Sequence, residues 1–207
     1  MTPPADAFPA SAPSAPRPAS FLVLGYGNPG RQDDGLGVAC VEALERWAAA
    51  ERRPGLVFDS NYQLNIEDAL TVAGHDGVLF VDATRAPVAR FALRRIAPLA
   101  AATFSTHAMN PETVLALCAE LYDKRPAAWL LTIQGRGWEP NAAMTAEARA
   151  NLAAALSFIK AFLRNPVTSQ DSEFSRAAGR WPDRTERETM MARLVGTLSR
   201  LRLVAYT

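Results

Sequence analysis

Three polar residues lie where the sequence predicts the ends of strands or the loops that follow them. Asp34 comes after the apolar segment 21–24, Asp82 directly follows the segment 77–81, and His107 precedes a predicted helix. Neighbouring strands lie about 5 Å apart, so side chains at their tips can meet at one ion. Two carboxylates and an imidazole suit zinc, nickel or another first-row metal better than calcium or magnesium, and they leave a coordination position for water or substrate.

Each of the three residues also has an ordinary structural interpretation. Asp34 could cap the helix that follows it, Asp82 could form a turn, and His107 could hydrogen bond to the backbone of its own loop. The spacings of 48 and 25 residues form no local motif. The residue types alone therefore leave both interpretations open.

A glycine-rich segment, residues 25–37, separates the first apolar segment from a helical pattern. Its five glycines are Gly25, Gly27, Gly30, Gly35 and Gly37. The first three match the G-x-G-x-x-G pattern of dinucleotide-binding proteins, in which a helix starts within the motif and binds the phosphate. Here the last two glycines would fall in the first turns of that helix, each costing about 1 kcal/mol. The adjacent Asp33 and Asp34 would also repel a pyrophosphate, so we predict a longer loop with the helix beginning near Leu36, and nucleotide binding becomes the less favoured alternative.

The remaining chain alternates strand and helix patterns. We predict strands at 21–24, 56–58, 77–81, 88–96 and 129–133, and helices from Leu36, at 66–72 after Asn61 or Asn65, from Asn110–Pro111, and at 146–163 after Thr145. This alternation predicts an α/β fold with three layers, a twisted and mostly parallel central sheet with helices on both faces. Ligands of such sheets bind outside the carboxyl ends of the strands.

Composition divides the chain into three parts. Residues 1–20 contain six prolines and no hydrophobic segment, which predicts a disordered tail rather than a secretory signal. Residues 21–164 form the predicted α/β domain. Residues 165–207 are predicted to be a linker followed by an amphipathic helix at 186–204, whose role the sequence leaves open.

Charge and cysteine content exclude several classes of partner. The net charge of +1 favours neither nucleic acid nor an anionic membrane, and no apolar segment approaches the ~20 residues of a membrane span. The two cysteines, Cys40 and Cys118, have no C-x-x-C partner and lie in apolar helical patterns. We therefore expect buried thiols and a cytoplasmic protein.

The glycine-rich segment 25–37, the segment Phe80-Val81-Asp82-Ala83 and the segment Ser105-Thr106-His107 together resemble the NiFe-hydrogenase maturation proteases. The likeness extends over about residues 21–163. It implies an α/β fold and an endopeptidase that removes a C-terminal peptide from the hydrogenase large-subunit precursor once nickel has been inserted. The residues that bind the metal in that family fall on Asp34, Asp82 and His107, which are also the expected catalytic residues.

The resemblance also implies the metal and the partner. Nickel would arrive with the precursor, and zinc or cadmium could replace it in the isolated protein. The sequence lacks H-E-x-x-H, G-x-S-x-G and an evident Cys-His pair, which fits a protease that borrows the metal of its substrate. Hydrolysis would use either a metal-polarised water or carbonyl, or one of the carboxylates as a base.

Three loop residues are candidates for supporting roles. Asp33 is either a second-shell residue of the metal site or a helix cap, and Asn28 and Arg31 either fix the loop or contact the substrate. Many family members have an Asp-Gly-Gly segment where this chain has residues 59–65, a difference that leaves open which hydrogenase is served. The main rival function is a non-catalytic nickel-binding chaperone, which would leave the mass of the precursor unchanged.

Overall fold

The computed structural model describes residues 19–99, 109–164 and 166. The described strands are β1 (Phe21–Tyr26), β2 (Leu56–Asn61), β3 (Gly77–Thr84), β4 (Phe91–Ile96) and β5 (Ala127–Gln134). The described helices are the 3-10 helix η1 (Gln32–Gly35) and the α-helices α1 (Leu36–Ala50), α2 (Asp68–Ala73), α3 (Pro111–Tyr122) and α4 (Ala146–Arg164). The predicted tail and the predicted helix at 186–204 lie outside these residues, except for Ala19 and Ser20, so those predictions stay untested.

The strands form one sheet in the order β2-β1-β3-β5-β4. Four of them are parallel, and β4 runs antiparallel to β5 at one edge. The parallel strands are connected through helices, whereas β4 follows β3 through a short loop, and this direct connection returns it in the opposite direction. The mostly parallel α/β sheet is therefore confirmed.

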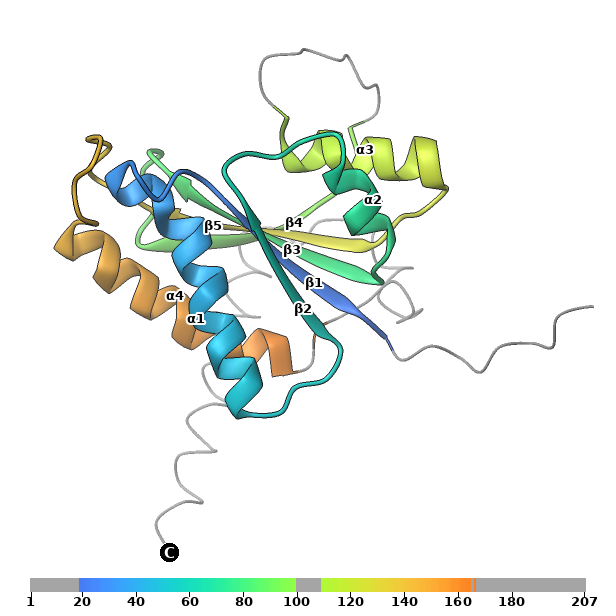
Figure 1. Cartoon of the computed structure of the whole chain (residues 1–207), viewed down its shortest axis with the longest axis horizontal. Helices are drawn as coiled ribbons and strands as arrows, with labels where there is room; N and C mark the ends of the chain where they lie inside the picture. The colour runs from blue at the N-terminus through green and yellow to red at the C-terminus, as the bar shows by residue number, and fades with distance from the viewer. Residues whose placement is uncertain (1–18, 100–108, 165, 167–207) are drawn as a thin grey trace, which may run out of the picture. The chain divides into compact units, whose positions relative to one another are not determined.

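Helices cover both faces of the sheet, with α1 and α4 on one face and α2 and α3 on the other (Figure 1). Alternate residues of β3 supply both hydrophobic clusters. Leu79 and Val81 are buried on the α1/α4 face, and Val78 and Phe80 are buried on the α2/α3 face. The three-layer architecture follows from this central strand, which is apolar on both faces because both are covered.

The glycines of the segment 25–37 allow its backbone to lie directly on the strand ends. A Cβ on Gly37 would lie 2.6 Å from the Val81 carbonyl oxygen, so α1 starts in contact with β3. Gly27 has a φ of +132°, and a Cβ there would overlap the Asp34 carbonyl oxygen. Because these positions face the chain's own backbone, these glycines serve backbone packing rather than a phosphate cradle.

The starts of three helices agree with the predictions from the sequence. The α1 helix begins at Leu36. Asn110 caps α3 by accepting a 2.8 Å hydrogen bond from the Thr113 N–H, with proline at the first helical position. Thr145 caps α4 in the same way through Ala148, at 3.1 Å. These capping contacts involve residues three apart, which is why the sequence predicts them.

The four parallel strands extend beyond their predicted bounds, so Asp82 lies inside β3, and the predicted starts of α2 and β4 were wrong. The α2 helix begins at Asp68 rather than Ile66, and its N-cap is Glu67 rather than Asn61 or Asn65. The Asn61 amide and the Asn65 backbone N–H instead donate to the Asp68 carboxylate, at 2.8 and 2.7 Å. Similarly, β4 begins at Phe91 rather than Val88, because only the segment from Phe91 onward pairs with β5.

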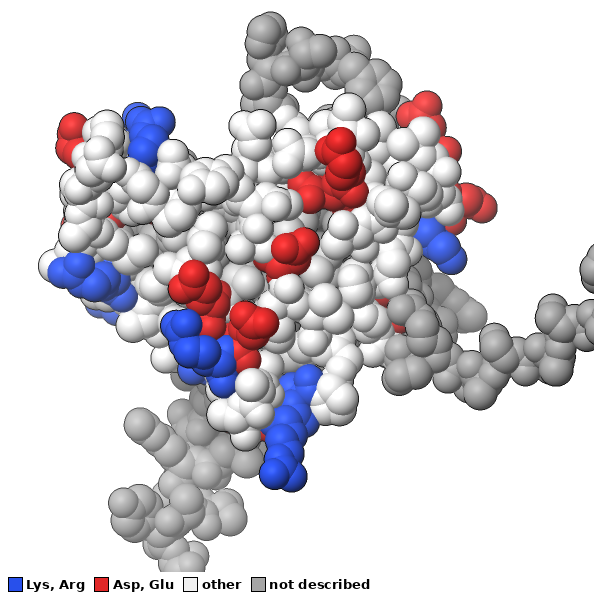
Figure 2. All heavy atoms as spheres, viewed as in Figure 1, with Lys and Arg blue, Asp and Glu red and all other residues white. Residues whose placement is uncertain are grey.

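The described surface carries both signs of charge. Figure 2 shows acidic and basic side chains interspersed over the face that it displays, without a large basic area. None of the described helices is long and apolar enough to cross a membrane. Cys40 and Cys118 are both buried free thiols in helices, as predicted.

Candidate active site at the carboxyl edge of the sheet

Asp82 lies near the carboxyl end of β3, on the face covered by α2 and α3. Its side chain follows those of Val78 and Phe80 on this face because successive residues of a strand alternate between faces. The pKa of Asp82 is raised to about 6, mainly by burial and to a smaller extent by the charge of Asp34, against the lowering effect of hydrogen bonding from the Tyr26 hydroxyl and the Ala83 N–H. Asp82 is therefore a carboxylate that is costly to leave charged without a cation.

Asp34 belongs to η1, the short helix that joins the glycine-rich loop to α1 and contacts β3. Its Oδ2 atom accepts a 3.2 Å hydrogen bond from the Asn28 N–H. The effect of its charge on Asp82 places the two carboxylates within electrostatic reach. The structure thus brings together two of the three predicted ligands, from segments almost fifty residues apart.

Tyr26 is a member of this cluster that the sequence analysis did not identify. It is the last residue of β1, and its hydroxyl lies close enough to the Asp82 carboxylate for hydrogen bonding to affect the pKa values of both groups. Burial first, and then the charge of Asp82, hold the pKa of Tyr26 above its usual range, so the hydroxyl stays a proton donor. Strand alternation offered a signal, because Tyr26 follows Leu24 on the same face just as Asp82 follows Phe80.

The predicted third ligand, His107, lies outside the described residues. The chain re-enters the described region at Met109, which packs against the same hydrophobic cluster as Tyr26, and α3 begins at Pro111. Within residues 19–99, 109–164 and 166, no three His, Cys, Asp or Glu side chains form a group that could hold a metal ion. The described part of the site is therefore a pair of carboxylates.

Asp33 is buried and lies on a different side of the loop from its neighbour in the sequence. Its carboxylate accepts hydrogen bonds from the backbone of Arg136 (2.7 Å), Gly137 (2.9 Å) and Thr145 (2.7 Å), and from the Thr145 hydroxyl (2.8 Å). Burial acts to raise the pKa of Asp33, but these hydrogen bonds outweigh burial and hold it below its usual value. Asp33 joins the glycine-rich loop to the β5–α4 loop and to the start of α4.

The fold of this chain is similar to that of several solved structures. The NiFe hydrogenase maturation protease HycI from Thermococcus kodakarensis KOD1 superimposes with a TM-score of 0.56 at 20% identity, over 71% of this chain and 94% of that chain. The hydrogenase maturating endopeptidase HybD from E. coli gives 0.55 at 22% identity, over 70% of this chain and 92% of that chain. An endopeptidase from Escherichia coli superimposes with a TM-score of 0.54 at 21% identity, over 72% of this chain and 94% of that chain.

This chain has the hydrogenase maturation protease fold. The fold implied by the resemblance in sequence is therefore confirmed. No protein-family model matches the chain, and no curated protein matches it. Because one fold can carry several activities, the activity must be argued from the side chains of the site.

Within the maturation protease fold, Asn28 and Arg31 lie in the loop that leads to Asp34. The Asn28 side chain accepts a 2.8 Å hydrogen bond from the Gly30 N–H, and its backbone donates to Asp34, so Asn28 stabilises the loop. Arg31 contributes backbone hydrogen bonds to Asn28 and Asp34, and its side chain is exposed. The substrate contact of Arg31 stays a prediction.

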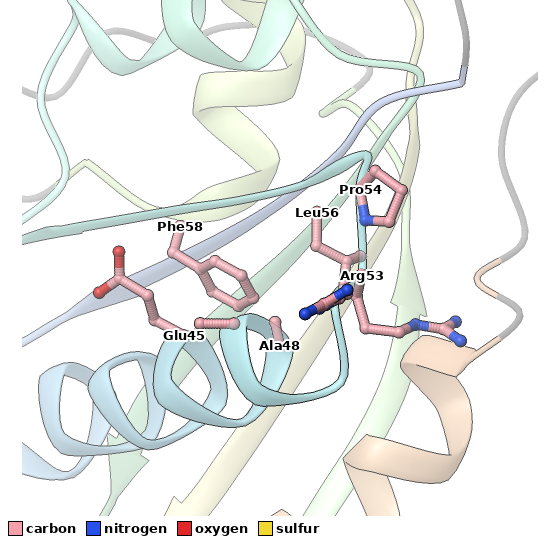
Figure 3. A pocket seen from close by; sticks show the side chains of 8 residues that line it. Glu45, Ala48, Arg53, Pro54, Leu56 and Phe58 are labelled. Carbon is pink, nitrogen blue, oxygen red and sulfur yellow. The ribbon is translucent and has the colours of Figure 1, made fainter.

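A separate pocket of about 520 Å³ lies between the second half of α1 and β2 (Figure 3). Its lining combines apolar side chains with three charged ones: Glu45, Ala48, Ala49, Arg52, Arg53, Pro54, Leu56 and Phe58. The lining comes from the end of α1 and the beginning of β2, whereas Asp34 and Asp82 lie near the start of α1 and the end of β3. The pocket is therefore distinct from the carboxylate pair of this maturation protease fold.

Proposed function

We propose that this chain is an endopeptidase that removes the C-terminal extension of a NiFe-hydrogenase large-subunit precursor after nickel insertion. The observation that carries the proposal is the convergence of Asp34 and Asp82 at the carboxyl edge of a maturation protease fold. Solved structures described as hydrogenase maturation proteases share that fold with this chain.

The donor set suits a metal that the substrate brings. Two carboxylates with their charges close together are expensive to ionise side by side, and a divalent cation relieves that repulsion. Asp82 accepts two hydrogen bonds, from Tyr26 and Ala83, and a carboxylate has about four lone-pair positions, so it retains acceptor capacity for a metal. We propose that His107 supplies the third ligand, since oxygen and nitrogen ligands together suit nickel, zinc and cadmium.

In this proposal the residues of the chain recognise nickel that the precursor already holds. Asp34, Asp82 and His107 complete its coordination and so position the scissile bond beside it. A divalent ion in this position polarises a carbonyl group or a water molecule. Either that water attacks directly or a carboxylate of the pair accepts its proton.

The intact mass of the precursor tests the proposal. Nickel-loaded and nickel-free precursor would each be incubated with the wild-type protein, with Asp82→Asn, and with Asp123→Asn as a control. Asp123 is an exposed carboxylate at the C-terminal end of α3, shortly before β5 begins opposite Gly77, so it lies toward the other end of β3 from Asp82. We expect loss of a C-terminal peptide only with nickel, and only with the wild type and Asp123→Asn.

The alternative outcomes separate the rival functions. Metal-dependent complex formation with an unchanged precursor mass would refute the protease and leave the nickel-binding chaperone. Cleavage of the nickel-free precursor at the same rate would refute nickel gating while keeping the endopeptidase. Cleavage by Asp82→Asn at the wild-type rate would refute the assignment of the active site.

A further inference from the structure

We propose that Tyr26 is a positioning residue that holds the Asp82 carboxylate in the orientation required for metal binding. The inference rests on the proposed function, because it assigns Asp82 as a ligand. It adds a residue that lies outside the predicted ligand set.

The strand register places the two side chains next to each other. In the parallel pairing of β1 and β3, Gly25 lies opposite Val81, so the next residues along the strands, Tyr26 and Asp82, are also neighbours. Both side chains point to the face covered by α2 and α3, because each lies two residues beyond a residue buried on that face. Adjacent side chains on one face of a sheet lie about 5 Å apart, within reach of a hydroxyl group.

The contact restrains Asp82 without consuming its capacity as a ligand. The Tyr26 hydroxyl donates to the carboxylate from one side chain, and the Ala83 N–H donates from the backbone of β3 itself. In this proposal, hydrogen bonding from the Tyr26 hydroxyl restricts the rotation of the Asp82 carboxyl group. A carboxylate has about four lone-pair positions, so hydrogen bonding from these two groups leaves acceptor capacity for a metal.

Tyr26 is itself held in place by its surroundings. Its ring packs against the hydrophobic cluster of the α2/α3 face, to which Met109 also belongs. Nearby, Arg94 on β4 and Glu112 on α3 form a 2.7 Å ion pair, and their charges act on the pKa of Tyr26 in opposite directions. A rigid donor of this kind orients its acceptor, as hydrogen-bonding partners of metal ligands commonly do.

The Tyr26→Phe variant isolates this role, because phenylalanine keeps the ring and loses only the hydroxyl. Loss of one orienting partner of a metal ligand commonly weakens metal binding by about 10- to 100-fold. Tyr122→Phe is the matched control, since Tyr122 is 38% exposed and ends α3. Asp82→Asn removes the ligand itself.

Cadmium titration of the full-length proteins by calorimetry, at pH 7.5, tests the inference directly. We expect Tyr26→Phe to bind cadmium about 10-fold more weakly than the wild type, Tyr122→Phe to match the wild type, and Asp82→Asn to bind much more weakly than either. Melting temperatures measured in chelator would be compared alongside. Equal cadmium affinity for Tyr26→Phe and the wild type would overturn the inference, and so would a wild type that binds no cadmium.

Kinetics with nickel-loaded precursor provide a second measurement. If the Asp82 carboxylate is poorly oriented, the geometry of the reacting atoms changes more than the binding of the precursor does. We therefore expect Tyr26→Phe to lower kcat about 10-fold with KM nearly unchanged. A rise in KM alone would instead indicate a substrate-contact role and contradict positioning. If no variant cleaves the precursor while the cadmium affinities differ as expected, the proposed protease function fails and the positioning role of Tyr26 stands.

Discussion

At the scale of single residues, the adjacent carboxylates Asp33 and Asp34 have different environments. The carboxylate of Asp33 is buried and accepts four hydrogen bonds, whereas that of Asp34 is partly exposed and accepts one from Asn28. The difference arises because η1 directs one side chain toward the β5–α4 loop and the other toward β3. We therefore assign Asp33 to the stability of the loop, which leaves Asp34 as the carboxylate available for the proposed metal site.

Amide substitutions separate these roles. Asp33→Asn replaces one carboxylate oxygen with an NH2 group, which is a hydrogen-bond donor, although all four partners at this position are donors themselves. We therefore expect the unfolding free energy to fall by about 2–4 kcal/mol. Asp34→Asn is expected to cost less than about 1 kcal/mol while weakening metal binding. Urea unfolding of both variants at pH 7 measures the difference. Similar stabilities for the two variants would contradict the assignment.

The acid side of the stability curve provides a further check on Asp33. Because its pKa is lowered on folding, the folded protein binds this proton more weakly than the unfolded chain. The stability that the ionised Asp33 carboxylate contributes is complete above about pH 4, and it is lost as the pH falls through the lowered pKa of Asp33. Asp33→Asn should therefore lose less stability than the wild type on acidification through that range.

Asp82 makes the opposite contribution to stability. Burial raises its pKa from 3.8 to about 6, so the folded protein binds the proton more tightly than the unfolded chain, and stability falls as pH rises between these values. In chelator, Asp82→Asn should be more stable than the wild type at pH 8 by about 1–3 kcal/mol. Urea unfolding at pH 8 and pH 4 measures this gain, which should disappear at pH 4. A gain that is equal at both pH values would point to a cause other than ionisation.

At the scale of elements, the junction between η1 and α1 determines where Asp34 lies. The junction reaches the strand ends because Gly37 has no side chain between α1 and β3. A Cβ on Gly37 would meet the Val81 carbonyl oxygen at 2.6 Å and the Tyr26 backbone nitrogen at 2.9 Å. The position of the carboxylate pair therefore depends on a backbone contact between the helix and two strands.

Gly37→Ala tests this dependence. Alanine favours a helix by about 1 kcal/mol, but overpacking against rigid backbone costs about 1–3 kcal/mol, so we expect a net loss of unfolding free energy and weaker cadmium binding. The matched change is Gly74→Ala at the end of α2, where the nearest atom to the new Cβ would be the Thr71 carbonyl oxygen at 3.2 Å. Urea unfolding and cadmium titration measure both effects. Stabilisation by Gly37→Ala would show that helix propensity dominates.

At the scale of the whole described domain, the two hydrophobic clusters share the same strands. Leu79 belongs to the cluster under α1 and α4, and Phe80 to the cluster under α2 and α3, and both are fully buried. Neither face can lose its packing without disturbing the strand that supports the other. The two faces are therefore expected to unfold together.

Truncation on either face should give one cooperative transition. We expect Leu79→Ala to lower the unfolding free energy by about 2–5 kcal/mol and Phe80→Ala by about 3–5 kcal/mol. Val57→Ala, at an edge-strand side chain that is 40% exposed, is the control, with a loss below about 1 kcal/mol. Circular dichroism and tryptophan fluorescence should report coincident transitions. Separate transitions in the two signals would mean that the faces unfold independently.

The sequence by itself predicted the features that depend on neighbouring residues. The start of α1 at Leu36 and the caps at Asn110 and Thr145 follow from contacts within one helical turn. The alternation of strands and helices predicted a mostly parallel sheet, and the structure confirms it. These predictions hold because backbone propensities and strand direction are local or follow from simple topology, whereas the metal site at Asp34, Asp82 and His107 stays a prediction.

Only the tertiary structure decided which distant residues are partners. Asp33 pairs with backbone groups more than one hundred positions away, between Arg136 and Thr145, and no local pattern encodes that contact. Tyr26 meets Asp82 because β1 and β3 are adjacent, in a particular register, in the sheet. Strand order and register depend on how all the apolar faces pack at once, so the residues that support the site became visible only in the folded chain.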